Sequence, residues 1–149
     1  MISQTAEYAL RAVVFLADQA PAPQTTQQIA KVTMAPAGYL AKVMQGLSRA
    51  GLVHAQRGLH GGFTLARSPE ELTVLDVVQA VDPIRRITHC PLGLKGHAAL
   101  CPLHRRLDSA MATAEDALRR STIAELLREP GKHKGKRVPK PLCSVADEE

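Results

Sequence analysis

The chain has 149 residues with a formal net charge of +5, and hydrophobic residues make up 45% of it. A chain of this length suits one domain, with room for a dimerisation element, and can bury a moderate core. Because it contains no Trp and few other aromatic residues, that core must consist mainly of aliphatic side chains. The sequence has no phosphate-binding glycine loop, no recognisable nucleophile–base pair and no paired-carboxylate motif, so we expect that the protein is not an enzyme.

The N-terminal region lacks the pattern of a secretory signal, because the apolar run 13–17 is short and lies between Arg11 and Asp18. The same run is too short to span a membrane. The chain has three cysteines, an odd number that argues against a disulfide framework. We therefore expect a cytoplasmic protein that does not bind membranes.

The charged residues are distributed unevenly along the chain. The segment 132–140 carries five Lys or Arg residues and no carboxylate, and the composition beyond Pro130 is typical of a disordered basic tail. From Gln19 to Pro69 there is no Asp or Glu, although Lys, Arg and His residues are present. This depletion is expected of a surface that faces phosphates, because a carboxylate there would oppose binding.

Three helices are predicted before the first glycine-rich segment. The first is capped by Ser3 or Thr5 and ends before Pro21. The second covers about 26–32 and the third covers 37–49, with apolar residues at helical spacing in both. Since only a short turn separates the last two helices, they form a helix-turn-helix pair whose second helix enters the major groove of DNA.

A glycine-rich hairpin follows the third helix. Gly51 ends that helix, because a residue without Cβ tolerates the left-handed conformation. Strands are predicted at 53–56 and 63–65, with Arg57 and His60 in the turn between them. A helix followed by an arginine-tipped hairpin is the layout of a winged helix-turn-helix. This layout favours DNA binding over the simpler interpretation of an amphipathic core helix.

The second half of the chain predicts a helix at 73–81, an aperiodic loop at 84–100 and a long helix from Pro102 to Arg120. The long helix has a narrow apolar stripe suited to pairing with a second copy, and packing only on its own domain is the alternative. Thr122 opens a short terminal helix with a capping box. The predicted fold is mainly α with a small β wing, organised as a winged helix-turn-helix domain (1–82), a cysteine-containing sensor loop (83–101), a dimerisation helix with the terminal helix (102–129) and a basic tail (130–149).

Several ordered motifs between Met1 and about Arg128 resemble one known family. They are TAEYALRA at 5–12, GYLAKVMQGL at 38–47, the glycine-rich wing at 51–63, LDVVQAV at 75–81 and CPLH at 101–104. These motifs resemble the Rrf2-type bacterial transcription regulators, the family of IscR, NsrR, RirA and CymR. The resemblance implies a homodimeric winged-helix regulator, usually a repressor, on a palindromic operator. Its recognition helix enters the major groove and its wing reaches toward the minor groove.

The resemblance also places DNA-binding residues on this chain. Four positions fall on the groove-facing start of the recognition helix, and Arg57 matches the wing arginine of the family. Some members carry a glutamate where Ala41 stands, so base discrimination that depends on that carboxylate is not expected here. The candidate DNA-binding residues are Gln28, Gly38, Tyr39, Ala41, Lys42, Gln45, Arg57 and His60.

Many members of the family hold an iron–sulfur cluster through three cysteines in the loop before the long helix. Thiolates suit iron because they are soft, anionic ligands. This chain has Cys90 and Cys101 at the first and third positions, but Lys95, Gly96 and His97 where the middle cysteine is expected. The resemblance implies a cluster, 2Fe-2S in preference to 4Fe-4S, with Cys90, Cys101, His97 and the partner subunit's Glu7 as candidate ligands and His104 as a further nitrogen donor.

The sensing chemistry has alternatives. A cluster would make the protein a sensor of iron–sulfur, redox or nitric oxide state. Cys90 and Cys101 could instead form a reversible disulfide, or remain buried thiols in a regulator that senses through a protein partner. Cys143 lies in the tail and is expected to be a bystander. The winged helix could also serve as a protein-interaction module that does not bind DNA.

Overall fold

The computed structural model describes residues 2–93 and 99–129. The positions 95–97, including the candidate ligand His97, and the basic tail with Cys143 lie outside the described residues. The predicted fold class is confirmed, because the described chain consists of helices and one two-stranded antiparallel sheet. In chain order the elements are α1 (Gln4–Gln19), α2 (Thr26–Thr33), α3 (Ala37–Arg49), β1 (Val53–Gln56), β2 (Gly62–Leu65), α4 (Val74–Val81), α5 (Pro102–Arg120) and α6 (Ile123–Arg128).

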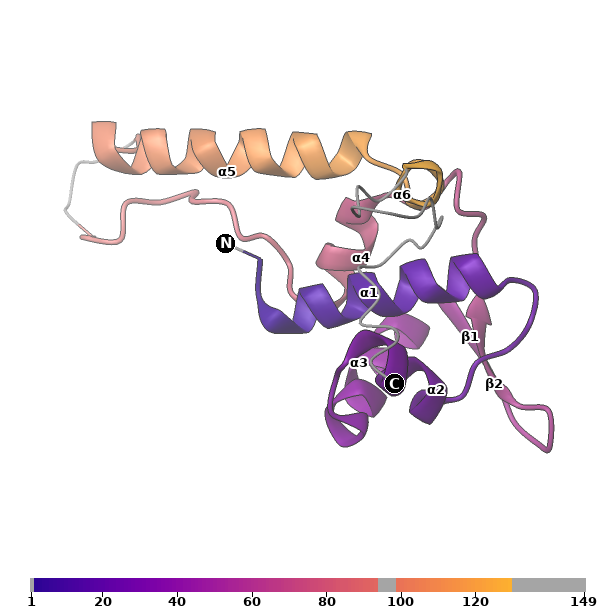
Figure 1. Ribbon diagram of the computed structural model, residues 1–149. Helices are drawn as coiled ribbons and strands as arrows, with labels where there is room; N and C mark the ends of the chain where they lie inside the picture. Colours follow the sequence, from indigo (N-terminus) through magenta and orange to yellow (C-terminus); the bar gives the residue numbers. More distant parts are fainter. Residues whose placement is uncertain (1, 94–98, 130–149) are drawn as a thin grey trace, which may run out of the picture.

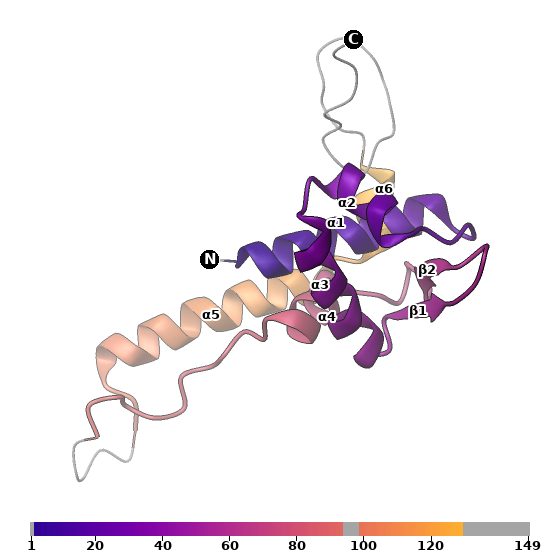
Figure 2. The same ribbon diagram turned by 90° about the horizontal axis from the view of Figure 1, so that it is seen from below.

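Helix α1 lies at the centre of the body that all elements except α5 form (Figures 1 and 2). Of the two predicted caps, Ser3 is the one used: its Oγ accepts a hydrogen bond of 3.2 Å from the Ala6 N–H, and Thr5 lies inside the helix. Helices α2, α3, α4 and α6 all pack against α1. Small side chains on its buried face let these helices approach; the buried residues are Ala6, Ala9, Ala12, Val13, Val14, Leu16 and Ala17.

Helices α2 and α3 form the helix-turn-helix pair. A capping box starts α2, in which the Thr25 and Gln28 side chains each accept a backbone hydrogen bond from the other residue. The helix ends one residue later than predicted, at Thr33, and Met34 makes the turn with a φ of 56°. Helix α3 has the predicted bounds and buries Leu40, Val43, Met44 and Leu47 against the body.

Strands β1 and β2 form the wing, with Val53 opposite Leu65 and Gln56 opposite Gly62. The wing is fixed to the segment before α2, because Gln24 and Phe63 exchange backbone hydrogen bonds of 3.0 and 2.8 Å. Gly62 is required at this contact: its φ is +147°, and a Cβ there would lie 2.7 Å from the Gln24 backbone. The glycine therefore lets the wing approach the start of the helix-turn-helix.

Helix α5 extends away from the body and α6 returns to it (Figure 1). The turn between α5 and α6 is hydrogen-bonded to the segment at the start of α4. The Val74 N–H donates to the Ser121 carbonyl at 2.9 Å, and the Ile123 N–H donates to the Leu72 carbonyl at 2.9 Å. Helix α6 buries Ile123 and Ala124, whereas α5 buries none of its residues. None of the helices in the described ranges has the length and apolar content needed to cross a bilayer.

Candidate functional site

The outward surface of α3 and the wing carries the basic residues of the carboxylate-free span. Lys42, Gln45 and Arg49 are exposed on α3, and Arg57 and His60 are exposed at the wing. Within the described ranges, no ion pair involves Lys42, Arg49 or Arg57. Figures 1 and 2 place α3 and the wing on the side of α1 that faces away from α6. This side of the body therefore presents positive charge that nearby carboxylates do not neutralise.

The tip of the wing is a tight turn. The Gly61 N–H donates to the Gly58 carbonyl at 3.0 Å. A Cβ at Gly61 would lie 2.4 Å from the Gln56 carbonyl oxygen, so only glycine fits there. Arg57, Leu59 and His60 are exposed around this turn, and Leu59 is 96% exposed. The turn thus holds a cation and an imidazole at the far end of the wing.

The start of α3 is held against α1. The Tyr39 ring meets the Tyr8 ring edge-on, with centroids 6.0 Å apart, and its hydroxyl forms a hydrogen bond with the Thr5 hydroxyl. Arg11, which also pairs with Glu7, donates to the Thr33 carbonyl at 3.0 Å, so α1 also fixes the turn before α3. These contacts set the angle at which α3 projects from the body.

The predicted DNA-binding residues differ in how free their side chains are. The Gln28 Oε1 accepts the Thr25 N–H at 2.8 Å, so this side chain caps α2. The Tyr39 hydroxyl is likewise bonded within the protein, although 41% of the residue remains exposed. Gly38 is exposed with open space around it, and Ala41 is half-buried. Lys42, Gln45, Arg57 and His60 are exposed, and none of their side chains forms a hydrogen bond within the described ranges.

Arg67, which belongs to the same carboxylate-free span, points elsewhere. It donates to the Glu71 carbonyl at 3.1 Å and lies 3.5 Å from an Asp76 carboxylate oxygen. Arg67 therefore joins the end of the wing to α4. Its position in the sequence gave no sign of this, because both partners lie beyond the end of the span.

The loop after α4 runs back along α5 toward the first turn of that helix (Figure 1). Arg86 donates two hydrogen bonds to the Asp108 carboxylate, at 2.7 and 2.6 Å, and the Ile87 N–H donates a third at 2.9 Å. The Arg86 hydrogen bonds and then the Ile87 amide lower the pKa of Asp108 to about 2. Arg86 also lies 3.7 Å from Glu115. These contacts, which join residues more than twenty positions apart, fix the course of the loop on α5.

This course brings Cys90 to Cys101 and His104. The Sγ atoms and one ring nitrogen of these half-buried residues all lie within 4.8 Å of one another. His104 Nδ1 lies 3.1 Å from Cys101 Sγ and 3.8 Å from Cys90 Sγ. Cys101 precedes the first residue of α5 and His104 stands three positions later, so the start of the helix presents both on one face. We call Cys90, Cys101 and His104 the thiol–imidazole site.

The start of α5 also changes the acidity of Cys101. Its pKa is lowered from 9.0 to about 7, first by the His104 amide, then by the His104 ring and, to a smaller extent, by the Leu103 amide. These N–H groups at the start of α5 point toward the sulfur and stabilise its negative charge. A thiolate, the form that binds metals, is therefore readily available at neutral pH.

Of the predicted metal ligands, the structure brings together Cys90 and Cys101 and joins them with His104. The other candidate nitrogen donor, His97, lies outside the described residues. Glu7 pairs with Arg11 on α1 of its own chain, and the prediction that the partner subunit's Glu7 reaches the thiol–imidazole site stays a prediction. His89, next to Cys90, forms a hydrogen bond of 2.7 Å with Thr88 and is not part of that site.

Comparison with known proteins assigns the family. A family model described as Rrf2, iron-dependent transcriptional regulator, matches residues 2–129. The chain belongs to the Rrf2 family. A helix-turn-helix-type transcriptional regulator of Aquifex aeolicus is 30% identical over 137 residues, which are 89% of this chain and 95% of the relative. A second regulator, described as rrf2-like and from Rhodobacter capsulatus, is 34% identical over 55% of this chain and 57% of its own.

Solved structures of Rrf2 proteins have the same fold. CymR, the global cysteine regulator of B. subtilis, superposes with a TM-score of 0.70 and 26% identity, over 85% of this chain and 95% of CymR. T. potens IscR superposes with a TM-score of 0.71 and 23% identity, over 86% of each chain. The chain is therefore a transcription regulator with a DNA-binding winged-helix fold, and the prediction that it is not an enzyme agrees with this family.

Proposed function

We propose that this Rrf2 protein is a homodimeric, sequence-specific DNA-binding repressor that acts at a palindromic operator. The observation that supports this most is the surface of α3 and the wing, where Lys42, Arg49 and Arg57 have no ion-pair partner among the described residues. Cations of this kind bind phosphates and release counterions. The proposal assigns DNA binding to residues 1–82, sensing to 83–101 and dimerisation to 102–129.

In the proposed complex α3 enters the major groove and the wing reaches the minor groove. Lys42 and Gln45 are exposed on α3. The Lys42 ammonium can donate to guanine O6 and N7, and the Gln45 amide can donate to adenine N7 and accept from adenine N6. Arg57 and His60 at the wing would contact the backbone and the narrower groove. Tyr39 and Gln28 contribute mainly through position, because the Tyr39 hydroxyl and the Gln28 Oε1 already bond within the protein.

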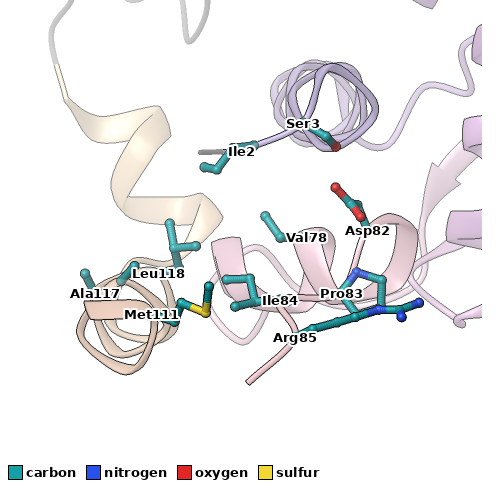
Figure 3. Close-up of a pocket in the computed structure, with 11 residues that line it drawn as sticks. Ile2, Ser3, Val78, Asp82, Pro83, Ile84, Arg85, Met111, Ala117 and Leu118 are labelled. Atoms are coloured by element: carbon teal, nitrogen blue, oxygen red, sulfur yellow. The ribbon is translucent and has the colours of Figure 1, made fainter. Parts of the chain in front are cut away.

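Dimerisation is proposed through α5, whose apolar stripe is exposed and is not covered by the described residues of one chain. Leu103, Leu107 and Met111 are 62%, 45% and 36% exposed. Toward the C-terminal end of α5 the stripe continues into an apolar cavity of about 650 Å³ between α4, α5 and the segment that starts α1 (Figure 3). Figure 3 shows Met111 and Leu118 on one wall and Ile2 on another. A second copy laid along α5 would cover the stripe and the mouth of this cavity together.

An iron–sulfur cluster, which the resemblance implies, has to be compared with the donors present. Each tetrahedral iron of a 2Fe-2S cluster binds two sulfides and has room for only two protein ligands, and each iron of a 4Fe-4S cluster has room for one. Here three donors converge within 4.8 Å of one another, and only two of them are thiolates. The described donors alone do not complete a cluster, so the proposed mechanism includes no step that depends on one.

The proposed regulation is a population shift controlled by the thiol–imidazole site. The site joins the loop to the first turn of α5, and the far end of α5 is hydrogen-bonded to the body through Ser121 and Val74. A change at the site would alter the position of α5 relative to the loop. Because α5 is the proposed dimer contact, the distance between the α3 helices of the two protomers would change with it. Half-sites one helical turn apart require a spacing of roughly 34 Å, so a modest rotation would weaken binding.

A second candidate for sensing is a reversible disulfide. Cys90 and Cys101 are free thiols whose sulfur atoms lie within 4.8 Å of each other. The lowered pKa of Cys101 favours the thiolate, which is the form that oxidants attack. Replacing Cys90 or Cys101 would remove this redox response and leave the fold of residues 2–82 intact.

The direct test of the function is DNA selection followed by salt titration. Purified protein is incubated with random-sequence duplexes, the retained fragments are sequenced, and binding of the enriched site is measured over a range of salt. We expect a palindromic site and an affinity that falls linearly with salt on logarithmic axes. Absence of any enriched duplex, in both oxidised and reduced protein, would reject the proposal and favour a protein-interaction module.

A further inference from the structure

Cys90, Cys101 and His104 surround a single position. We infer that they bind one divalent transition-metal ion, zinc by the chemistry of the donors, with these three residues as its ligands in the described part of the chain. The inference rests on the proposed function for its consequence, control of DNA binding, but the ion-binding site itself depends only on these three residues. A single ion takes the place of the cluster that the resemblance implies. The iron atoms of a cluster are distinct, and each would need its own protein ligands at its own position.

The distances agree with one ion. Zinc binds thiolate sulfur at about 2.3 Å and imidazole nitrogen at about 2.0–2.1 Å, so neighbouring donors of a tetrahedral site lie roughly 3.5–3.8 Å apart. His104 Nδ1 lies 3.8 Å from Cys90 Sγ and 3.1 Å from Cys101 Sγ, and all three donors lie within 4.8 Å. Small side-chain rotations are sufficient to place an ion between them.

The charge and type of the donors select the metal. Two thiolates and a neutral imidazole neutralise a divalent ion, which suits residues that are all half-buried. Soft sulfur ligands favour zinc over magnesium or calcium, which prefer oxygen. Two cysteines and one histidine with a fourth position open form a donor set that zinc also uses in catalytic sites, whereas structural zinc sites have four protein ligands. A ligand from outside these three residues, such as a water molecule, would complete the coordination.

The surrounding chain holds the donors in place before an ion arrives. Cys101 and His104 have fixed relative positions because they lie on the first turn of α5. Cys90 stands at a turn in which the Gly93 N–H donates to the Cys90 carbonyl at 3.2 Å, and the bonds of Arg86 and Ile87 to Asp108 fix the loop just before it. An ion would thus join two segments that are already aligned and would hold them together more firmly.

The test uses the full chain, freed of metal with a chelator and then titrated with Zn²⁺, and with Co²⁺ as a spectroscopic probe. We expect one ion per chain, no acid-labile sulfide in anaerobically purified protein, and the visible spectrum of tetrahedral thiolate-bound Co²⁺. Losing a second-shell partner alone costs about 10–100-fold in metal affinity, so Cys90→Ser and His104→Ala should each cost more than roughly 100-fold.

Two further variants keep the test decisive. His89→Ala removes a neighbouring imidazole outside the site and should bind Zn²⁺ like the unaltered chain. His104→Cys retains a donor and should bind one Co²⁺ with stronger sulfur charge-transfer absorption, which would show that a loss in His104→Ala comes from the missing ligand and not from misfolding. Stoichiometric iron with sulfide, no stoichiometric Zn²⁺, or equal affinity in His104→Ala would overturn the inference.

DNA binding, measured on the same samples, distinguishes this inference from the proposed function. DNA binding that changes when Zn²⁺ is added supports both. DNA binding by a chain that takes up no ion removes the inference and leaves the proposed function. An ion bound at the site of a chain that binds no duplex supports the ion site and removes the proposed function.

Discussion

The body of the molecule and the arm formed by α5 with its loop are held together by different interactions. The body has an aliphatic core in which Leu16, Ile29 and Leu40 are at most 2% exposed. The arm buries no residue of α5 and is held to its loop by charged hydrogen bonds, chiefly those of Arg86 with Asp108. A region held by apolar burial keeps its shape alone, whereas a region held by a few polar contacts can respond to a ligand or a partner. This difference suits the body for binding DNA and the arm for sensing.

Truncating one leucine in each region should show the difference in stability between the body and the arm most clearly. Leu16→Ala in α1 leaves a cavity in the core and should lower the free energy of unfolding by about 2–5 kcal/mol. Leu107→Ala removes the same atoms from the exposed face of α5 and should change it by no more than about 0.5 kcal/mol in dilute protein. Urea unfolding measures both values. Equal losses in the two variants would contradict the distinction between body and arm.

A charge on the stripe of α5 should affect assembly and not folding. Leu107→Glu places a carboxylate in the proposed dimer contact and should raise the dissociation constant of the dimer at least roughly 100-fold, about 2.8 kcal/mol. Ser109→Glu adds the same charge on the opposite side of the helix, by the helical period of 3.6 residues, and is the matched control. Analytical ultracentrifugation measures both. If the two variants dissociate equally, the stripe is not the interface.

The sequence predicted the body better than the arm, because the body depends on local signals. The bounds of α3 and α5 agree with the predictions, since apolar periodicity, Pro102 and the residues that end each helix lie within the helix itself or next to it. The course of the loop was not predicted, because Arg86 and Asp108 lie 22 positions apart and nothing local links them.

The candidate sites show the same limit. His97, which stands where the missing cysteine is expected, lies outside the described residues, and the structure brings the other candidate nitrogen donor, His104, to the two cysteines. A signal for His104 did exist: it stands three positions after Cys101 at the start of a predicted helix. Likewise Arg67 lies in the carboxylate-free span that is expected to face phosphates but contacts α4 instead, which only the tertiary structure reveals.

Removing the wing arginine should weaken DNA binding without disturbing the body. Arg57 is exposed and has no ion-pair partner in the described part of the chain. Arg57→Ala should weaken binding roughly tenfold, about 1.4 kcal/mol, and reduce the salt slope by about 1. Arg128→Ala on α6, on the other side of α1 (Figure 1), is the control and should bind DNA normally. Normal affinity in Arg57→Ala would remove the wing from the contact surface.

The smallest effect that we predict is a local response of the arm to acid. The pKa of Asp108 is lowered from 3.8 to about 2 by the Arg86 hydrogen bonds and the Ile87 amide, so the folded arm favours the ionised carboxylate. The resulting stabilisation is fully present above the pKa of the unfolded chain, 3.8, and is lost as the pH falls toward about 2. Exchange of the Ile87 amide hydrogen, followed by NMR, should therefore speed up over this range, after correction for the intrinsic pH dependence of exchange.

Asp108→Asn supplies the control for that measurement. The amide keeps one acceptor for the Ile87 N–H but loses the charge, so exchange should be faster than in the unaltered chain above pH 3.8 and should show no transition between 3.8 and about 2. Amides in the body, such as that of Val13, are buried far from this carboxylate and should respond only to global unfolding. If the Ile87 and Val13 amides lose protection together as the pH falls, the arm has no independent stability, and the proposed control of DNA binding through the loop would need a different origin.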